Sequence, residues 1–122
     1  LKLELLNDYL EIGQYKSVLL ILKEESARKR YPPQANYYLG EAYRLRDDEG
    51  DVKKSVDAYL ASIAAVPDFS PPYRAMGIHY MKHNESDKAI SYFTKYLELS
   101  PHASDIGYIK NYISKSQSMR GK

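Results

Sequence analysis

The chain has 122 residues, with 18 lysines and arginines against 16 aspartates and glutamates, and it contains no cysteine. Its length is enough for one domain with its own apolar core. The absence of cysteine excludes disulfides and thiolate metal sites. A formal net charge of only +2 argues against a dedicated nucleic-acid-binding protein. No apolar run approaches the roughly 18 residues of a membrane span, and no signal peptide is visible.

Apolar residues at helical spacings predict a first pair of helices at about 2–12 and 15–30. Gly13 breaks the pattern between them. A Tyr-Pro-Pro segment at 31–33 ends the second helix, because a residue before proline is pushed out of the α region. The apolar stripe of this pair consists of Leu3, Leu6, Leu10, Val18, Leu19 and Leu22.

A second pair of helices is predicted at about 34–46 and 52–65, with a stop at Pro67. Asp51 is expected to cap the later helix by accepting a hydrogen bond from a free backbone N–H of its first turn. The acidic turn at 47–49 is expected to be exposed. It is not expected to be a calcium loop, because the twelfth place of an EF-hand counted from its first aspartate holds no glutamate. The expected buried residues are Tyr38, Leu39, Ala42, Tyr43, Val52, Val56, Tyr59, Leu60 and Ile63.

A third pair of helices and a final single helix complete the pattern. Ser70 precedes a proline and is expected to cap a helix that ends near His83. Its partner is predicted at about 87–99. A capping helix at about 104–116 has one apolar stripe and one polar face, as the end of a repeat array needs. Residues 117–122 form a short, polar, terminal segment that we expect to be disordered. Inward positions are expected at Ala89, Ile90, Phe93, Tyr96, Leu97, Ile106, Ile109 and Ile113.

Two segments of the chain repeat each other. Residues 73–80 follow the pattern of residues 36–43, each with a glycine three residues before its last tyrosine, and Pro67 and Pro101 lie 34 residues apart. The segments are 37 residues apart and the prolines 34, and a period of about this length indicates stacked supersecondary units. The chain also contains 13 tyrosines and no tryptophan. Most of these rings are expected in the core or at its boundary, since tyrosine combines a large apolar ring with a polar tip.

The spacing of these residues resembles the tetratricopeptide repeat, a helix-turn-helix unit of about 34 residues. The third unit matches without gaps at Tyr73, Met76, Gly77, Tyr80, Ala89, Phe93 and Pro101. The second matches at Leu39, Gly40, Tyr43, Ser55, Tyr59 and Pro67, with three extra residues in its turn. The first hairpin fits less well, because Leu6 and Val18 replace the usual small pair. The resemblance covers nearly the whole chain.

The resemblance implies an all-α fold in which helical hairpins form a right-handed superhelical array, or α-solenoid, closed by a C-terminal capping helix. The expected single domain spans 1–116, with hairpins at about 2–30, 34–66 and 70–100, the cap at about 104–116, and the tail at 117–122. The small residues Gly40 and Ser55, and likewise Gly77 and Ala89, are expected to let two helices cross closely. Aromatic rings are then expected to fill the space between neighbouring units.

In this family the first helix of each hairpin lines a concave groove in which partners lie as extended peptides or helices. The resemblance therefore implies a non-catalytic scaffold that binds a protein or peptide, without a cofactor. Tyrosine and arginine often contribute most of the binding energy at such surfaces. The alternative for each candidate is an ordinary solvated or partly buried helix residue. The groove positions that the resemblance implies are Asn7, Tyr37, Tyr38, Glu41, Arg44, Arg74, Ile78 and Met81.

A different function stays open beside the scaffold. The chain begins inside an expected helix, so we expect it to be a piece of a longer protein. Residues 96–112 look like repeat ends of bacterial envelope proteins, some of which carry a metalloprotease domain before the repeats. The alternative is thus an accessory region of such a protein, or a self-association region whose apolar residues 1–10 pair with a second copy to form a homo-oligomer. The bacterial cytoplasm and the periplasm or envelope both remain open as locations.

Signals for chemistry are weak. His79 and His83 lie four residues apart on one helix face, yet no third metal ligand is evident and no glutamate follows the first histidine as in zinc proteases. We therefore expect two surface histidines and no metal site. The basic run at 28–30 is explained by its place near a helix C-terminus, and the low net charge argues against RNA binding. No Ser-His-Asp order or Gly-rich phosphate loop is present, so we expect no enzyme activity.

Overall fold

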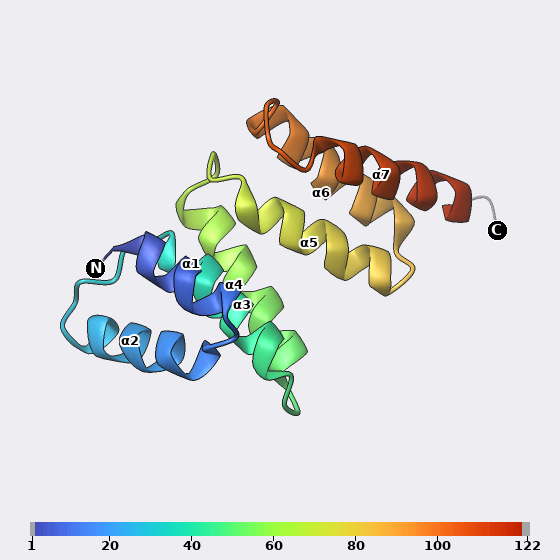
Figure 1. The fold of residues 1–122 in the computed structure, drawn as a ribbon. Coiled ribbons are helices and arrows are strands. Elements are labelled where there is room, and N and C mark those ends of the chain that lie inside the picture. Colours follow the sequence, from blue (N-terminus) through green and yellow to red (C-terminus); the bar gives the residue numbers. More distant parts are fainter. Residues whose placement is uncertain (1, 121–122) are drawn as a thin grey trace. The chain divides into compact units, whose positions relative to one another are not determined.

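A computed structural model describes residues 2–120, which form seven α-helices and no strand (Figure 1). The described residues group into two compact units that divide between Pro67 and Asp68. The all-helical prediction is confirmed, and the division falls where the sequence predicted the end of the second hairpin. In the first unit the helices are α1 (Leu3–Glu11), α2 (Tyr15–Ala27), α3 (Ala35–Arg46) and α4 (Asp51–Ala65). In the second they are α5 (Pro71–Lys82), α6 (Ser86–Leu99) and α7 (Ile106–Arg120).

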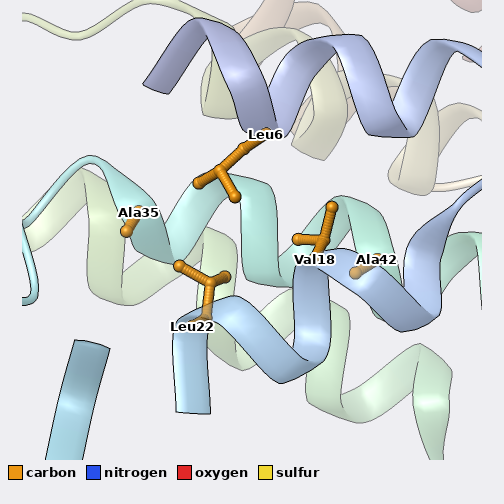
Figure 2. Packing of buried hydrophobic residues seen from close by; sticks show 5 residues of the cluster. All are labelled: Leu6, Val18, Leu22, Ala35 and Ala42. Carbon is orange, nitrogen blue, oxygen red and sulfur yellow. The ribbon is translucent and has the colours of Figure 1, made fainter. Parts of the chain in front are cut away.

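The core of the first unit lies where α1, α2 and α3 meet. Leu6 on α1 and the α2 residues Val18 and Leu22 all point toward α3 (Figure 2). On α3 they contact Ala35 and Ala42. Leu6 and Val18 are completely buried, so the bulky pair that replaces the expected small pair fills the centre of this hairpin. Helix α3 packs on α4 as well as on α1 and α2, which makes it the central helix of the unit.

Glycine is required in both later hairpins because an aromatic ring lies against the backbone of the first helix. A Cβ atom on Gly40 would lie 2.6 Å from the Tyr59 ring, and one on Gly77 would lie 2.5 Å from the Phe93 ring. Both distances are shorter than any carbon–carbon van der Waals contact. The predicted close crossing is confirmed. The Tyr59 and Phe93 rings fill the space beside each glycine within their own hairpins, and the Phe93 ring also packs on Tyr112 of the following helix α7.

The turn between α3 and α4 is held by a buried ion pair. Asp51 is 1% exposed, and both of its carboxylate oxygens accept hydrogen bonds from the Arg46 guanidinium, at 2.7 and 2.8 Å. The same carboxylate accepts a bond from the backbone N–H of Asp48 at 2.9 Å. The expectation that Asp51 caps α4 is wrong: it is the first residue of the helix, and its side chain turns back to the preceding loop, where Arg46 neutralises it.

This ion pair predicts a specific acid sensitivity. The hydrogen bonds from Arg46 lower the pKa of Asp51 to about 2. A depressed folded-state pKa stabilises the fold above the unfolded-state pKa of about 3.9, and that stabilisation is lost as the pH falls through about 2. Asp51→Asn cannot titrate, so the urea midpoint of the variant should fall less than that of the wild type between neutral pH and about pH 3. At neutral pH the variant should have the lower midpoint; equal acid sensitivity of the two proteins would contradict this role for Asp51.

In the second unit, α5 and α6 form a hairpin, and α7 packs against α6. The Phe93 and Tyr112 rings lie 5.6 Å apart between α6 and α7. Ser70 makes no side-chain cap on α5, contrary to expectation; its hydroxyl instead accepts a 2.6 Å hydrogen bond from Ser100. The two ends of the hairpin are thereby joined.

Other differences from the predicted elements lie at helix ends and on the surface. Helix α2 ends at Ala27 because Lys29 adopts a left-handed conformation with φ of 56°. Helix α7 continues to Arg120, which pairs with Asp87 on α6 at 3.2 Å. Residues 117–120 are therefore helical where disorder was expected, and 121–122 lie outside the described residues.

Two predicted core residues are exposed. Val52 and Leu60, both on α4, are 48% and 39% exposed, because the face of α4 that carries them is not covered by a helix of its own unit. The expectation that most tyrosine rings lie in the core or at its boundary is confirmed. All 13 tyrosines lie within the described residues, and all but Tyr108 are buried or partly buried. Between residues 2 and 120, no helix combines the length and the apolar character that crossing a membrane requires.

Candidate partner-binding surface

Three of the predicted groove residues form a polar stripe on α3. Tyr37, Glu41 and Arg44 follow one another at spacings of four and three residues, which places them on one helix face. The Glu41 carboxylate accepts hydrogen bonds from the Tyr37 hydroxyl at 3.2 Å and from the Arg44 Nε at 2.8 Å. A fourth residue, Tyr59 on α4, donates a hydrogen bond from its hydroxyl to the same carboxylate. We call these four residues the α3 stripe cluster.

Glu41 organises the cluster through hydrogen bonds to three side chains. Its two oxygens are engaged by two hydroxyls and a guanidinium. Burial raises the pKa of Tyr59, and the Glu41 charge raises it further, so this hydroxyl stays protonated and donating. The hydrogen bond to Glu41 raises the pKa of Arg44, which fixes its positive charge. The cluster is therefore a rigid arrangement of donors around one anion.

The Arg44 guanidinium retains capacity to bind a partner. Its side chain is 51% exposed, and its bonds to Glu41 run through Nε and one terminal nitrogen, the latter at 3.4 Å. A guanidinium carries five N–H donors in a planar fork, so further donors face solvent. Beside it, the Tyr37 ring is half-buried and lies 6.0 Å from the Tyr59 ring. The cluster thus presents a fixed cation next to an aromatic surface.

The other two predicted residues of the first unit have different surroundings. Tyr38 packs against the Leu6 core cluster, and its ring lies edge-to-face with the Tyr37 ring, with the two ring centroids 5.0 Å apart. Burial and then the charge of Glu4 raise its pKa. Tyr38 is therefore a structural residue that also supports Tyr37. Asn7 lies on the exposed face of α1 and donates a 3.2 Å hydrogen bond to Glu11.

In the second unit, Arg74 forms an internal link. Its Nε pairs with the carboxylate of Asp105, which lies just before α7 and also accepts a 2.8 Å hydrogen bond from the Tyr96 hydroxyl. Burial opposes ionisation of Asp105, but the bonds from Arg74 and Tyr96 prevail and lower its pKa. Burial and the bond to Asp105 raise the pKa of Tyr96 to about 12. The triad ties α5 to the segment between α6 and α7.

Ile78 and Met81 are both partly buried on α5. Met81 lines a hollow of about 290 Å³ that also involves α7 residues such as Lys115 and Met119. The second unit thus supplies apolar surface at these two positions.

Sequence reasoning missed Tyr59, Tyr96 and Asp105 as members of polar clusters. The two tyrosines fall on apolar helical stripes, and that position correctly predicted burial of their rings. Their hydroxyls, however, reach carboxylates 18 and 9 residues away in the chain. A buried tyrosine needs a partner for its hydroxyl, and this requirement is the signal that points to a nearby acceptor.

The histidine pair is close but incomplete as a metal site. The rings of His79 and His83 lie 4.4 Å apart, and the His83 Nδ1 lies 2.7 Å from the His79 carbonyl oxygen. Burial and the neighbouring His83 lower the pKa of His79. Within residues 2–120 no group of three or more histidine, cysteine or carboxylate side chains is placed to hold a metal ion.

No protein-family model matches the chain, and no curated protein sequence matches it. The tetratricopeptide resemblance therefore rests on the residues at the signature positions alone.

Proposed function

We propose that the chain is a non-catalytic scaffold of tetratricopeptide-like hairpins that binds a protein or peptide in a concave groove. In this proposal the hairpins stack as a right-handed solenoid, and the first helix of each, α1, α3 and α5, lines the groove. The observation that carries the proposal is the α3 stripe cluster, because it fixes a half-exposed arginine beside an aromatic ring on one of these helices.

The cluster supports binding because its side chains are already ordered. Immobilising a flexible side chain on binding costs about 0.5–1.5 kcal/mol, and Arg44 is held by Glu41 before any partner arrives. Arginine and tyrosine are also the types most enriched among residues that dominate binding energy. The chemistry suits a partner segment with a carboxylate or backbone carbonyl for Arg44 and an apolar side chain for Tyr37.

A capture experiment tests this proposal. The wild-type chain and a Tyr37→Ala/Arg44→Gln variant are used as baits in lysate of the source cells, after circular dichroism shows both to be folded. Tyr108→Ala/Lys110→Gln is the matched control, since it removes the same kinds of group from the exposed face of α7. We expect the wild type and the control to recover the same protein. The Tyr37→Ala/Arg44→Gln variant should bind that protein at least about tenfold more weakly, a loss of about 1.4 kcal/mol in binding free energy.

Equal recovery by all three baits would contradict a binding role for the α3 stripe cluster. Recovery of no protein would favour the accessory-region alternative, in which the partner belongs to the same longer chain.

Exposed apolar residues of the first hairpin favour a second candidate function, self-association. Leu5, Ile12 and Leu20 are 44%, 71% and 60% exposed, and pairing of two copies would remove this surface from water. Sedimentation velocity at increasing protein concentration tests it. A sedimentation coefficient that rises with concentration supports self-association, and a constant monomer value contradicts it.

A further inference from the structure

The first unit contains a pocket of about 560 Å³ that the α3 stripe cluster does not use. Helices α2, α3 and α4 all contribute to it. Its volume lies within the 300–1,000 Å³ typical of binding pockets. The residues that carry its chemistry are Leu19, Lys23, Leu39, Tyr43, Arg46 and Lys54.

The pocket and the α3 stripe cluster occupy different faces of α3. The pocket is lined by α3 positions 36, 39, 43 and 46, which recur at spacings of three and four residues and so share one stripe. The cluster uses positions 37, 41 and 44. At about 3.6 residues per turn these two stripes lie on roughly opposite sides of the helix. The pocket is thus a separate surface, and its role does not rest on the proposed groove.

The charged groups of the pocket are all positive. Lys23, Arg46 and Lys54 line it, and no aspartate or glutamate does so among the described residues. The charge of Arg46 is balanced by Asp51. Neither Lys23 nor Lys54 forms an ion pair with a described carboxylate. After the hydrogen bonds from Arg46, the charge of Lys54 also helps to lower the pKa of the Asp51 carboxyl, but neither Lys54 nor Lys23 is held in an ion pair, so both ammonium groups keep donors for a ligand.

The interior of the pocket is apolar and aromatic. Leu19, Leu22 and Leu39 supply aliphatic surface, and Tyr31 and Tyr43 supply rings. Burial, followed by the effect of Tyr43, raises the pKa of Tyr31 to about 12, so its hydroxyl adds no negative charge.

The Tyr43 ring joins the apolar interior to the cationic edge. The Arg46 guanidinium lies 5.2 Å from its centroid, and the Lys54 ammonium lies 5.6 Å away. Both distances are within the range of a cation–π contact. The cations are therefore held next to the apolar surface of the pocket.

We propose that this pocket, between α2, α3 and the start of α4, binds a short acidic peptide segment through one bulky apolar side chain flanked by carboxylates. The apolar side chain occupies the leucine and tyrosine interior, and the carboxylates pair with Lys23 and Lys54. A peptide supplies both features from adjacent residues, whereas a small organic acid with one carboxylate leaves one ammonium group without a partner. Charge complementarity thus selects the occupant.

An NMR titration with a defined probe tests the proposal. The probe is the acetylated and amidated hexapeptide Asp-Asp-Phe-Leu-Asp-Asp, and amide shifts of the labelled chain report where it binds. We expect the shifts of Ser26, Leu39 and Tyr43 to move, and those of Tyr37 and Glu41 to stay in place. Lys23→Glu/Lys54→Glu should weaken binding by at least about tenfold, and added salt should weaken the wild-type complex.

Matched variants separate the pocket from general charge. Lys16→Glu/Lys82→Glu changes the net charge equally at two exposed lysines that do not line the pocket, and it should bind within about twofold of the wild type, a typical effect of remote surface charge. Ser26 lines the pocket and is exposed to solvent. Ser26→Trp should therefore fill the pocket with a large ring and abolish peptide binding, while the circular dichroism spectrum stays unchanged.

Several results would overturn the proposal. The first is the absence of shift changes with the peptide, and the second is equal weakening in the two charge-reversal variants. Equal binding of a probe in which every aspartate is replaced by asparagine would remove the role of the carboxylates. Octanoate is titrated in parallel; binding of octanoate at Ser26, Leu39 and Tyr43 without binding of the peptide would assign the pocket to small organic acids instead.

Discussion

Gly77→Leu is expected to destabilise the second unit by about 3 kcal/mol or more, at the upper end of the costs of overpacking a core. Even a Cβ atom at this position would lie 2.5 Å from the Phe93 ring. Phe93 is completely buried, so its ring has no open space to enter. Urea denaturation gives the free energy of unfolding of the second unit. In thermal denaturation, the melting temperature of the variant should be lower than that of the wild type by about 10 °C or more.

Two controls connect this effect to the contact with Phe93. Gly107→Ala changes another helical glycine, but its Cβ atom would meet nothing within 4 Å. It should be neutral or stabilising by up to about 1 kcal/mol through helix propensity. In a double-mutant cycle, Phe93→Leu should relieve part of the cost of Gly77→Ala, with a coupling energy of about 0.5–3 kcal/mol. An unchanged melting temperature for Gly77→Leu would contradict the repeat register.

Leu6→Ala is expected to destabilise the first unit by about 2–5 kcal/mol, since the change leaves a cavity in a core that relaxes only in part. Leu6 is completely buried where α1 meets Val18 and Leu22 of α2 and the alanines of α3. Removing its branched end separates α1 from both neighbours. The measurement is the urea midpoint of the first unit, followed by circular dichroism.

The adjacent leucine provides the control for Leu6. Leu5 is 44% exposed on the same helix, and Leu5→Ala should change the free energy of unfolding by no more than about 0.5 kcal/mol. Equal losses for the two variants would show that α1 is held by general hydrophobicity and not by the specific packing of Leu6.

The helices were predictable because glycine and proline mark their ends and apolar residues mark their inner faces. Gly13 and Pro67, for example, fall at breaks that the structure also shows. The end of α7 was not predictable from this pattern, because residues 117–120 are mostly polar. The helix is continued there by the pairing of Arg120 with Asp87 on α6, an interaction that periodicity does not reveal.

The polar contacts were predictable only in part. The spacing of Tyr37, Glu41 and Arg44 on one helix was enough to group them. The bond from Tyr59 depends on how α3 and α4 cross, which the Gly40 contact determines in three dimensions. In the same way, the pairing of Arg74 with Asp105 joins α5 to a residue beyond the next helix, and the spacing of residues along α5 does not reveal it.

Asp51 illustrates how a local rule is overridden. An aspartate at the start of a helix normally caps free N–H groups. Here Arg46 lies close enough to form two charge-assisted hydrogen bonds with the carboxylate, and such bonds are roughly twice as strong as neutral ones. The stronger partner turns the side chain away from the helix, so the acidic turn carries less free negative charge than its sequence implies.

The central claim is that a partner binds the exposed faces of α1 and α3, and site-specific photo-crosslinking tests it most directly. A photoreactive side chain is placed in separate variants at Asn7 or Glu11 on α1, and at Leu20 or Leu60 on α2 and α4, all of which are exposed. Arg44 is left in place because it is needed for binding. Each variant is irradiated with the partner captured by the wild-type chain. We predict crosslinks from positions 7 and 11 and none from 20 and 60. Crosslinks from 20 and 60 alone would contradict the claim and place the partner on the second helices of the hairpins.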